Sequence, residues 1–517
     1  METLVFLWPG LRTTMWFVMG TVLPRNRRRF WIITIALLAP GFMPLRAAPC
    51  VELLKLKLHS GKITDAQTRA PNHTPATTAA VCKVAVTLTP TPDSDIKVEL
   101  WLPEANWNGK YMAVGNGGWS GSINYRGLED GVRRGYASSS TDTGHVGGSA
   151  SFALGHPEKL IDYAYRSEHE MAVQAKAIIA AYYGRQARFA YWNGCSAGGK
   201  QGLKEAQQYP ADFDGIVAGS PASNWTGRAV QAIWSAQAVH RDEASYIPPP
   251  KYPYLHNAVL AACDALDGVA DGVLENPKSC NFDPGAMECK GADSPHCLMA
   301  PQVAAARQLY SDSINPRTGQ HLYPGLQHGS ELGWATWAGI NPLGIALDYF
   351  RYVVFQNPAW NYRSLNFDSD IARVEALDTH RINATDPNLK PYFDHGGKLI
   401  QYHGWSDPQI SPGNSTAYYR SVVDKVGPSA DSSYRLFMVP GMGHCGGGEG
   451  TDSFDALQAL ETWVEQKKAP ASIPAARIRT GKVERTRPLC PFPQVAVYQG
   501  HGSTDEQANF ACKVLAQ

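Results

Sequence analysis

Short apolar runs, each closed by a glycine-rich or polar turn, recur along this 517-residue chain and are separated by helical patterns. The runs predict buried strands at residues 110–114, 189–192, 215–218, 399–402 and 434–439. The clearest helical pattern spans residues 160–183, where apolar side chains recur at the spacing of one helix face. Strands that alternate with helices in this way predict an α/β fold with a mostly parallel sheet.

The alternation stops between about Asn224 and Tyr392, and the strand pattern resumes at Lys398. The interrupted stretch contains clustered cysteines, several prolines and an aromatic-rich run, and it is too long for a loop. We therefore expect one core domain, built from residues 49–223 and 393–517, with a second domain at residues 224–392 inserted between two of its strands.

The composition excludes several classes of protein. Lys and Arg number 47 against 46 Asp and Glu, so the chain has no basic field that would hold a phosphate backbone, and no nucleic acid is expected as a partner. Hydrophobic residues make up 44% and charged residues 18%, which is too apolar for a disordered chain. With 48 Gly and 36 Pro, the chain is expected to be globular and rich in turns, and neither a coiled coil nor a multi-span membrane protein.

The first 48 residues predict a secretory signal segment. A basic run at 25–29 precedes an apolar run at 30–39, and small residues follow at 47–48. The apolar run is short for a bilayer, so we expect no stable membrane span in the mature chain, with a retained anchor as the alternative. All ten cysteines follow this segment, and an even cysteine set in an exported chain predicts disulfides and a secreted or periplasmic location.

The strongest local signal for chemistry is Gly194-Cys-Ser196-Ala-Gly198, between the strand at 189–192 and a helical pattern at 200–208. It fits the nucleophile elbow, a sharp strand-to-helix turn that presents a serine above the sheet edge. At such a turn, the backbone N–H of Ala197 is placed to bind a developing oxyanion. The alternative is an ordinary glycine–serine turn.

An acid and a base follow in the chain order that α/β-hydrolases use. Asp407 comes after the strand at 399–402, and His444 comes after the strand at 434–439. Because the carboxyl ends of parallel strands meet at one edge of a sheet, we predict a triad of Ser196, His444 and Asp407. Taken separately, Asp407 could cap a turn and His444 could be a loop histidine.

The cysteines next to these residues predict a covalent link. Cys195 precedes Ser196 and Cys445 follows His444, so the two cysteines become neighbours if serine and histidine meet. Two unrelated structural cysteines are the alternative. Short separations along the chain further suggest the pairs Cys263–Cys280, Cys289–Cys297 and Cys490–Cys512.

A glycine-spaced acidic segment lies in the predicted insert. Asp264, Asp267 and Asp271 fall within eight residues and would repel one another without a cation. Carboxylates supplemented by backbone carbonyls suit calcium, although the spacing departs from that of an EF-hand loop. A solvated acidic turn is the alternative.

Three of these motifs resemble those of the tannase and feruloyl esterase family, which also contains the mono(2-hydroxyethyl) terephthalate hydrolases. The matching segments are Gly-Cys-Ser-Ala-Gly-Gly at 194–199, His-Gly-Trp-Ser-Asp at 403–407 and Gly-His-Cys at 443–445. The resemblance extends from about residue 50 to residue 512. It implies an α/β-hydrolase core with an inserted lid domain, and it implies the pairs Cys195–Cys445 and Cys50–Cys82.

The resemblance also implies the remaining parts of a site. The glycine run at 115–118 is similar in position to the loop that supplies a second oxyanion-hole N–H, from Gly117 or Gly118, with a plain tight turn as the alternative. Members of the family carry a structural calcium ion in the lid. The matching ligands here are Asp264, Asp267, Asp271 and the carbonyls of Val269 and Val273.

Substrate contacts are predicted from aromatic residues of the insert. Trp334, Trp337 and Phe355 lie in its aromatic-rich run and could line a pocket for an aromatic acyl group, although they could equally form the core of the lid. His403 matches a position that lies near the substrate in the family. A structural role at the strand end is the alternative for His403.

Together these features predict a secreted serine esterase that hydrolyses esters of aromatic carboxylic acids through an acyl-enzyme. Its expected partner is a small feruloyl, galloyl (tannin), chlorogenate-like or terephthalate monoester of plant cell-wall or polyester origin. The expected cofactor is a structural Ca²⁺ ion, with no organic cofactor. Two alternatives are a non-catalytic, calcium-stabilised protein that binds plant polysaccharides or phenolics, and a serine peptidase of the same fold.

Overall fold

The computed structural model describes residues 47–71, 77, 79–378 and 381–514, all within one compact unit. The predicted signal segment falls outside these residues except for its last two positions. Within the described ranges, no helix combines the length and the apolar character that crossing a membrane would need.

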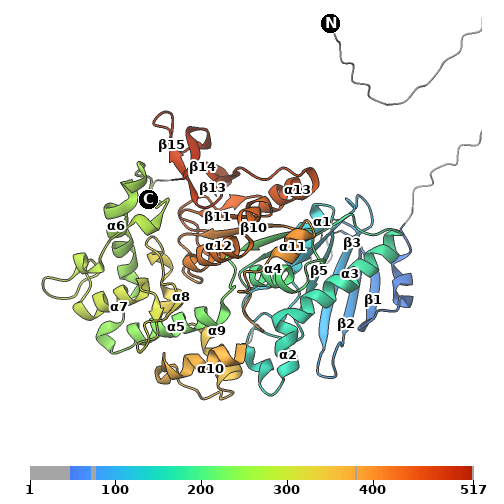
Figure 1. Cartoon of the computed structure of the whole chain (residues 1–517), viewed down its shortest axis with the longest axis horizontal. Coiled ribbons are helices and arrows are strands. Elements are labelled where there is room, and N and C mark those ends of the chain that lie inside the picture. Colours follow the sequence, from blue (N-terminus) through green and yellow to red (C-terminus); the bar gives the residue numbers. More distant parts are fainter. Residues whose placement is uncertain (1–46, 72–76, 78, 379–380, 515–517) are drawn as a thin grey trace, which may run out of the picture. The chain divides into compact units, whose positions relative to one another are not determined.

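A nine-stranded sheet, in the order β1-β2-β3-β5-β4-β6-β7-β10-β11, forms the centre of the molecule (Figure 1). The strands are β1 Gly61–Arg69, β2 Val81–Leu88, β3 Ile96–Pro103, β4 Lys110–Val114, β5 Ala137–Thr141, β6 Phe189–Cys195, β7 Gly215–Gly219, β10 Lys398–Gly404 and β11 Tyr434–Val439. The pairings among β1, β2, β3 and β5 are antiparallel, and all pairings from β5 to β11 are parallel. The α/β fold and all five predicted strands are confirmed.

Helices cover both faces of this sheet because its central strands are apolar on both sides. Tyr111 and Ile216 pack into one hydrophobic core and Met112 and Val217 into another. The helices are α1 Tyr125–Arg133, α2 Pro157–Ile161, α3 Ser167–Tyr183, α4 Ala197–Gln208, α12 Pro412–Val426 and α13 Ala456–Gln466. Figure 1 shows α3, α4 and α12 over the same face. The helical pattern predicted at 160–183 forms α2 and α3, joined by a wider π-type turn at Asp162–Arg166.

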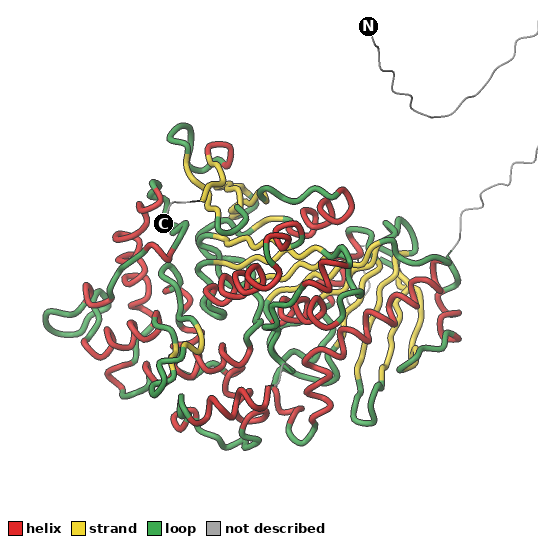
Figure 2. The backbone as a smooth tube through the Cα atoms, viewed as in Figure 1, coloured by secondary structure: helices red, strands yellow, loops and turns green. Residues whose placement is uncertain are grey.

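The segment between β7 and β10 is mostly helical and is inserted between two strands that pair directly, with Gly215 opposite Lys398 (Figure 2). Its elements are α5 Trp225–Val239, α6 Tyr252–Cys263, α7 Ala300–Tyr310, β8 Ser313–Ile314, β9 His321–Tyr323, α8 Ala335–Ala338, α9 Gly344–Asp348, α10 Ser369–Asp378 and α11 Lys390–Asp394. We refer to residues 224–392 as the insert. Their status as a separate lid domain stays a prediction.

The C-terminal part adds two small antiparallel sheets that the sequence analysis did not anticipate. Their strands are β12 Ser453–Phe454, β13 Ile473–Arg479, β14 Lys482–Leu489, β15 Gln494–Tyr498 and β16 Phe510–Val514. These strands are short or have few fully buried positions, so their apolar periodicity is weak.

Five disulfides join all ten cysteines, and no cysteine is free. The pairs are Cys50–Cys82, Cys195–Cys445, Cys263–Cys280, Cys289–Cys297 and Cys490–Cys512. Every predicted pairing is present. Such a density of disulfides is typical of proteins from oxidising compartments.

Candidate active site

Ser196 occupies the turn between β6 and α4 in a backbone conformation that serine rarely adopts, with φ 64° and ψ −123°. Its N–H donates to the carbonyl of Gly219, 2.9 Å away on the neighbouring strand. The adjoining glycines are needed for space, because a Cβ at Gly194 would lie 2.5 Å from the carbonyl oxygen of Gly198. A strained serine held between a strand and a helix has the geometry of a nucleophile elbow.

The glycine run at 115–118 follows β4 and faces this serine. Gly117 and Gly118 line the same cavity as Ser196, and Gly118 has a positive φ of 52°. The N–H groups of both glycines find no hydrogen-bond acceptor among the described residues. The loop is therefore placed beside the serine with free donors, and its role as an oxyanion hole with Ala197 stays a prediction.

His444 and Asp407 form a hydrogen-bonded pair at the same edge of the sheet. His444 Nδ1 donates to Asp407 Oδ2 over 2.7 Å, and Asp407 is fully buried. The other carboxylate oxygen accepts from the backbone N–H groups of Gln409 and Ile410, at 2.7 and 3.0 Å. Since an ionised carboxylate only accepts, Nδ1 carries the proton and Nε2 is left as a base.

The pKa of Asp407 is held well below its usual range. Burial opposes ionisation, but the electrostatic attraction and the hydrogen bonds of His444 and His403 more than offset that penalty. The acid is therefore ionised throughout the neutral range and can stabilise an imidazolium on His444.

Ser196 and His444 line one cavity of about 580 Å³. The disulfide Cys195–Cys445 ties their loops together, with the two Cα atoms 6.0 Å apart. The Ser196 hydroxyl makes no hydrogen bond to any described residue. Hydrogen bonds between nucleophile and base often tighten only when substrate binds, so the shared cavity is the more informative observation.

His403 does not line this cavity, in contrast to the prediction that it contacts substrate. It is fully buried behind Asp407, and its Nε2 donates to Asp407 Oδ2 at 3.1 Å and to the carbonyl of Ile410 at 3.0 Å. Its Nδ1 then accepts from the Ser415 hydroxyl at 2.7 Å. His403 is thus a second donor to the acid, which agrees with the structural alternative.

Trp334, Trp337 and Phe355 also lie outside the lining of this cavity. Both tryptophans are fully buried in a hydrophobic core of the insert, and Trp337 Nε1 donates to the carbonyl of Gln409 at 3.2 Å. Phe355 stacks on Trp360. These positions agree with the alternative that the residues form the core of the insert, and they give no support to a substrate pocket lined by them.

Other side chains form the cavity wall, among them Trp225 and Arg228 from α5, Ile345 from α9 and Tyr402 from β10. Sequence reasoning missed them. Trp225 and Arg228 start the helix that follows β7, at the same sheet edge as Ser196. The rule that strand ends meet at one edge would have pointed to these two residues.

The acidic segment of the insert surrounds a much smaller cavity, of about 20 Å³, which suits one ion or one water molecule. Four of the five predicted ligand residues line it: Asp267, Val269, Asp271 and Val273. Glu275, which the sequence analysis missed, lines it as well. Burial raises the pKa of Asp267 to about 6 and that of Glu275 to about 8.

The remaining predicted ligand, Asp264, does not line this small cavity. Its carboxylate instead accepts from the backbone N–H groups of Asp271, Gly272 and Val273, at 2.9 to 3.3 Å, and so shapes the loop. Arg487 forms an ion pair with Asp271. The donor set, with buried carboxylates at one small cavity, fits a hard cation. Arg485 and Arg487 line the same cavity and both pair with Asp271, so they compete with an ion for this carboxylate.

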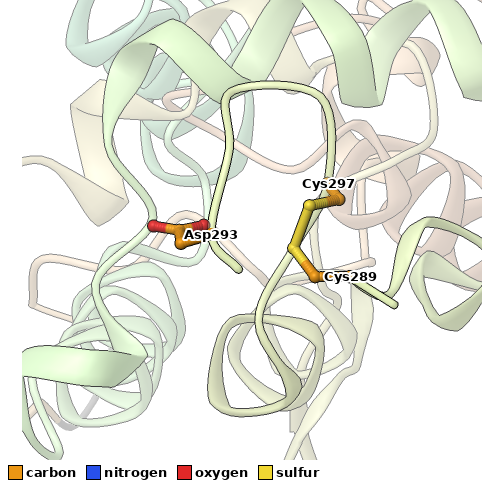
Figure 3. A group of neighbouring side chains, drawn as sticks. All are labelled: Cys289, Asp293 and Cys297. Atoms are coloured by element: carbon orange, nitrogen blue, oxygen red, sulfur yellow. A yellow bond between two sulfur atoms is a disulfide. The ribbon is translucent and has the colours of Figure 1, made fainter. Parts of the chain in front are cut away.

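A second group of potential metal ligands does not support a metal site. Donor atoms of Cys289, Asp293 and Cys297 lie within 4.8 Å of one another (Figure 3). However, the two sulfur atoms are joined in a disulfide, and Asp293 pairs with Lys251. A disulfide offers no thiolate, which is the form of cysteine that binds metals.

Comparison with known proteins gives consistent matches over almost all of the described chain. A family model described as tannase and feruloyl esterase matches residues 82–513. The chain is 37% identical over 525 residues to an uncharacterized esterase of Xanthomonas campestris pv. campestris, covering 90% of this chain and 91% of that protein. It is 36% identical over 458 residues to a probable feruloyl esterase B-2 of Aspergillus terreus, covering 83% and 86%. The crystal structure of feruloyl esterase B from Aspergillus oryzae matches with a TM-score of 0.84 at 30% identity, covering 90% of this chain and 99% of that one.

Proposed function

The chain belongs to the tannase and feruloyl esterase family and is a carboxylic ester hydrolase with an α/β-hydrolase fold, and we propose that it cleaves esters of aromatic acids through an acyl-enzyme on Ser196. The observation that carries this proposal is the cavity shared by Ser196 and the His444–Asp407 pair. The family assignment does not support a non-catalytic binding protein or a peptidase.

In the first half of the reaction, His444 Nε2 removes the proton of the Ser196 hydroxyl as its oxygen attacks the ester carbonyl. Asp407 holds the imidazole through Nδ1 and stabilises its positive charge. The N–H groups of Ala197 and of Gly117 or Gly118 stabilise the negative charge that develops on the carbonyl oxygen. The proton on Nε2 then passes to the leaving alcohol, which leaves the acyl group on Ser196.

In the second half, water enters the position of the alcohol and gives its proton to His444 as it attacks the acyl-enzyme. Collapse of the second intermediate releases the acid and returns the proton to Ser196. The disulfide Cys195–Cys445 supports both halves, because it limits the relative motion of the nucleophile and base loops.

Feruloyl, galloyl, chlorogenate-like and terephthalate monoesters are the candidate substrates. A wall that contains Trp225 and Tyr402 supports an aromatic acyl group, since ring contacts add to simple area burial. Five disulfides support a secreted or periplasmic location.

We further propose that the acidic segment binds Ca²⁺ through the side chains of Asp267 and Asp271 and the carbonyls of Val269 and Val273. Asp264 joins them if a bound ion draws its carboxylate from the loop backbone. An ion here stabilises the insert by offsetting the repulsion among buried carboxylates. EDTA should therefore lower the thermal midpoint by several degrees, and Ca²⁺ should restore it. An unchanged midpoint after verified metal removal would contradict the site.

The proposed reaction is tested by comparing the protein with its Ser196→Ala variant on methyl ferulate, methyl gallate, chlorogenate and a terephthalate monoester. We expect turnover of at least one ester by the protein and a fall of kcat by about 10⁴-fold or more in the variant. Circular dichroism controls for folding. Equal rates for the two proteins would refute the assignment of Ser196.

A further inference from the structure

One arginine in the wall of the active-site cavity has no acidic partner. Arg228, in the first turn of α5, is only 4% exposed and lines the cavity together with Ser196. Its Nε donates to the carbonyl of Gln409 at 2.8 Å. Within the described part of the chain, no carboxylate lies within ion-pair distance of its guanidinium group. Burying a charge without a counter-ion costs folding free energy, so the presence of a buried arginine at this position needs an explanation.

The ends of this guanidinium group are open to the cavity. The two terminal nitrogens, Nη1 and Nη2, donate to no described residue. Neither is fully buried, so both keep some solvent-accessible surface. Because the rest of Arg228 is covered and the residue lines the cavity, these nitrogens face it. Burial lowers the pKa of Arg228, but a guanidinium keeps its charge at neutral pH.

Neither nearby acid satisfies these donors. Asp407 attracts Arg228 electrostatically, but its two oxygens are already occupied by His444, His403 and two backbone N–H groups. Asp130, another acid of the cavity wall, is half exposed and pairs with Arg133. The Nη1 and Nη2 donors of Arg228 are therefore available to bind a group that enters the cavity.

We propose that Arg228 binds a carboxylate on the acyl part of the substrate, so that the enzyme prefers monoesters of aromatic dicarboxylic acids. The inference rests on the proposed esterase function and narrows its substrate class. Two parallel N–H donors match the geometry of a carboxylate, whereas a phenolic hydroxyl can engage only part of the fork. Trp225, the neighbouring wall residue, has its ring centroid 5.9 Å from the guanidinium carbon, so the cavity wall holds an aromatic ring beside the charge.

The test compares two esters that share a ring and a methanol leaving group and differ in one charge: monomethyl terephthalate and methyl 4-carbamoylbenzoate. The measured quantity is the ratio of their kcat/KM values. In the Arg228→Gln variant this ratio should fall by about 10- to 100-fold, chiefly through KM of the acid. Arg228→Lys keeps the positive charge but loses the pair of parallel N–H donors. Its ratio should therefore lie between those of the unmodified protein and of Arg228→Gln.

Arg351→Gln is the matched control, because this arginine of the insert does not line the cavity and donates to the carbonyl of Trp360. Its ratio should equal that of the unmodified protein. A change of less than threefold in Arg228→Gln would overturn the inference, since a purely structural arginine would affect both esters alike.

If Arg228→Gln does not fold, inhibition of the unmodified protein tests the same inference. Terephthalate should compete with a neutral ester at least tenfold more strongly than terephthalamide does. Equal inhibition by the two compounds would also overturn the inference. Loss of the proposed function is a separate outcome, in which the unmodified protein hydrolyses neither the charged nor the neutral esters.

Discussion

The core and the insert use their aromatic and polar residues differently. In the core, Ser196, Asp407 and His444 each follow a strand, and the parallel sheet brings the three strand ends to one edge. In the insert, Trp334 and Trp337 pack into a hydrophobic centre instead of facing the cavity. Connectivity thus fixes where strand-end residues lie, whereas tertiary packing decides which aromatic residues reach a cavity.

The largest expected effect lies in the core, at the acid. Asp407→Asn should lower kcat by about 10³- to 10⁴-fold, because an amide favours the wrong tautomer of His444 and cannot stabilise its charge. His403→Gln is the matched comparison, since it removes one donor to Asp407 and leaves the carboxylate. We expect a fall of about tenfold there. If steady-state kinetics showed similar losses of kcat for the two variants, the assignment of Asp407 as the catalytic acid would be contradicted.

Substitutions in the core of the insert should lower the stability of the protein more than they change its catalytic constants. Trp334→Ala should lower the free energy of unfolding by about 3–5 kcal/mol, because it empties a fully buried site. Trp334→Phe should cost less. Denaturant unfolding measures both losses, and KM of the folded fraction should change by less than about threefold. A selective rise in KM would show that Trp334 contacts substrate after all.

The same contrast explains how much could be predicted from the sequence. The five core strands have continuous apolar runs, and the elbow at Ser196 has a local signature, so the sheet and the triad candidates followed from pattern alone. Strands β1, β2, β3 and β5 of the main sheet, the β8–β9 pair and the C-terminal sheets were missed. In β1 and β14 the buried positions are too few to give a clear period.

The full set of residues that line the cavity could not be predicted from the sequence. Trp225 follows a strand end and could have been placed from the sequence, but Ile345 and Trp334 both lie well inside the insert. Only the packing of the insert decides that Ile345 lines the cavity and Trp334 does not. The role of His403 behind Asp407 depends on a hydrogen bond to Ser415, twelve residues further along the chain. Such side-chain contacts are set by tertiary structure and leave no periodic signal.

A third prediction concerns the contact between the two regions. His256 of α6 bonds at 2.7 Å both to buried Glu331 and to Glu449, in the loop that follows His444. Burial opposes its charge, but the two carboxylates more than offset this and raise the pKa of His256 to about 9. The charged form therefore stabilises the fold fully below about pH 6.5, the ordinary histidine pKa, and this stabilisation is lost as pH rises through 9.

His256→Gln tests this dependence. The difference in unfolding free energy between the protein and the variant should shrink by about 2 kcal/mol between pH 6 and pH 10, a value reduced because Glu449 is partly exposed. Denaturant titrations at several pH values measure it. A constant difference would mean that His256 contributes packing but no charge.

The smallest effect is expected at Gln201 in α4, which joins the nucleophile helix to the glycine loop. Its Oε1 accepts from the Asn116 N–H at 2.9 Å, and its Nε2 donates to buried Glu168 at 2.5 Å. Gln201→Leu should lower kcat by about tenfold with little change in KM, because the loop donors are mispositioned. Gln207→Leu, on the same helix with a bond to Tyr418, is the control. Equal kinetics for both variants would argue against a positioning role.

Covalent labelling tests the central claim most directly. After treatment with an excess of diethyl 4-nitrophenyl phosphate, intact-mass measurement and peptide mapping should find one diethylphosphoryl group, on Ser196, together with loss of esterase activity. The Ser196→Ala variant should remain unlabelled. An active protein that resists the reagent, or a label on another residue that accompanies inactivation, would contradict the account.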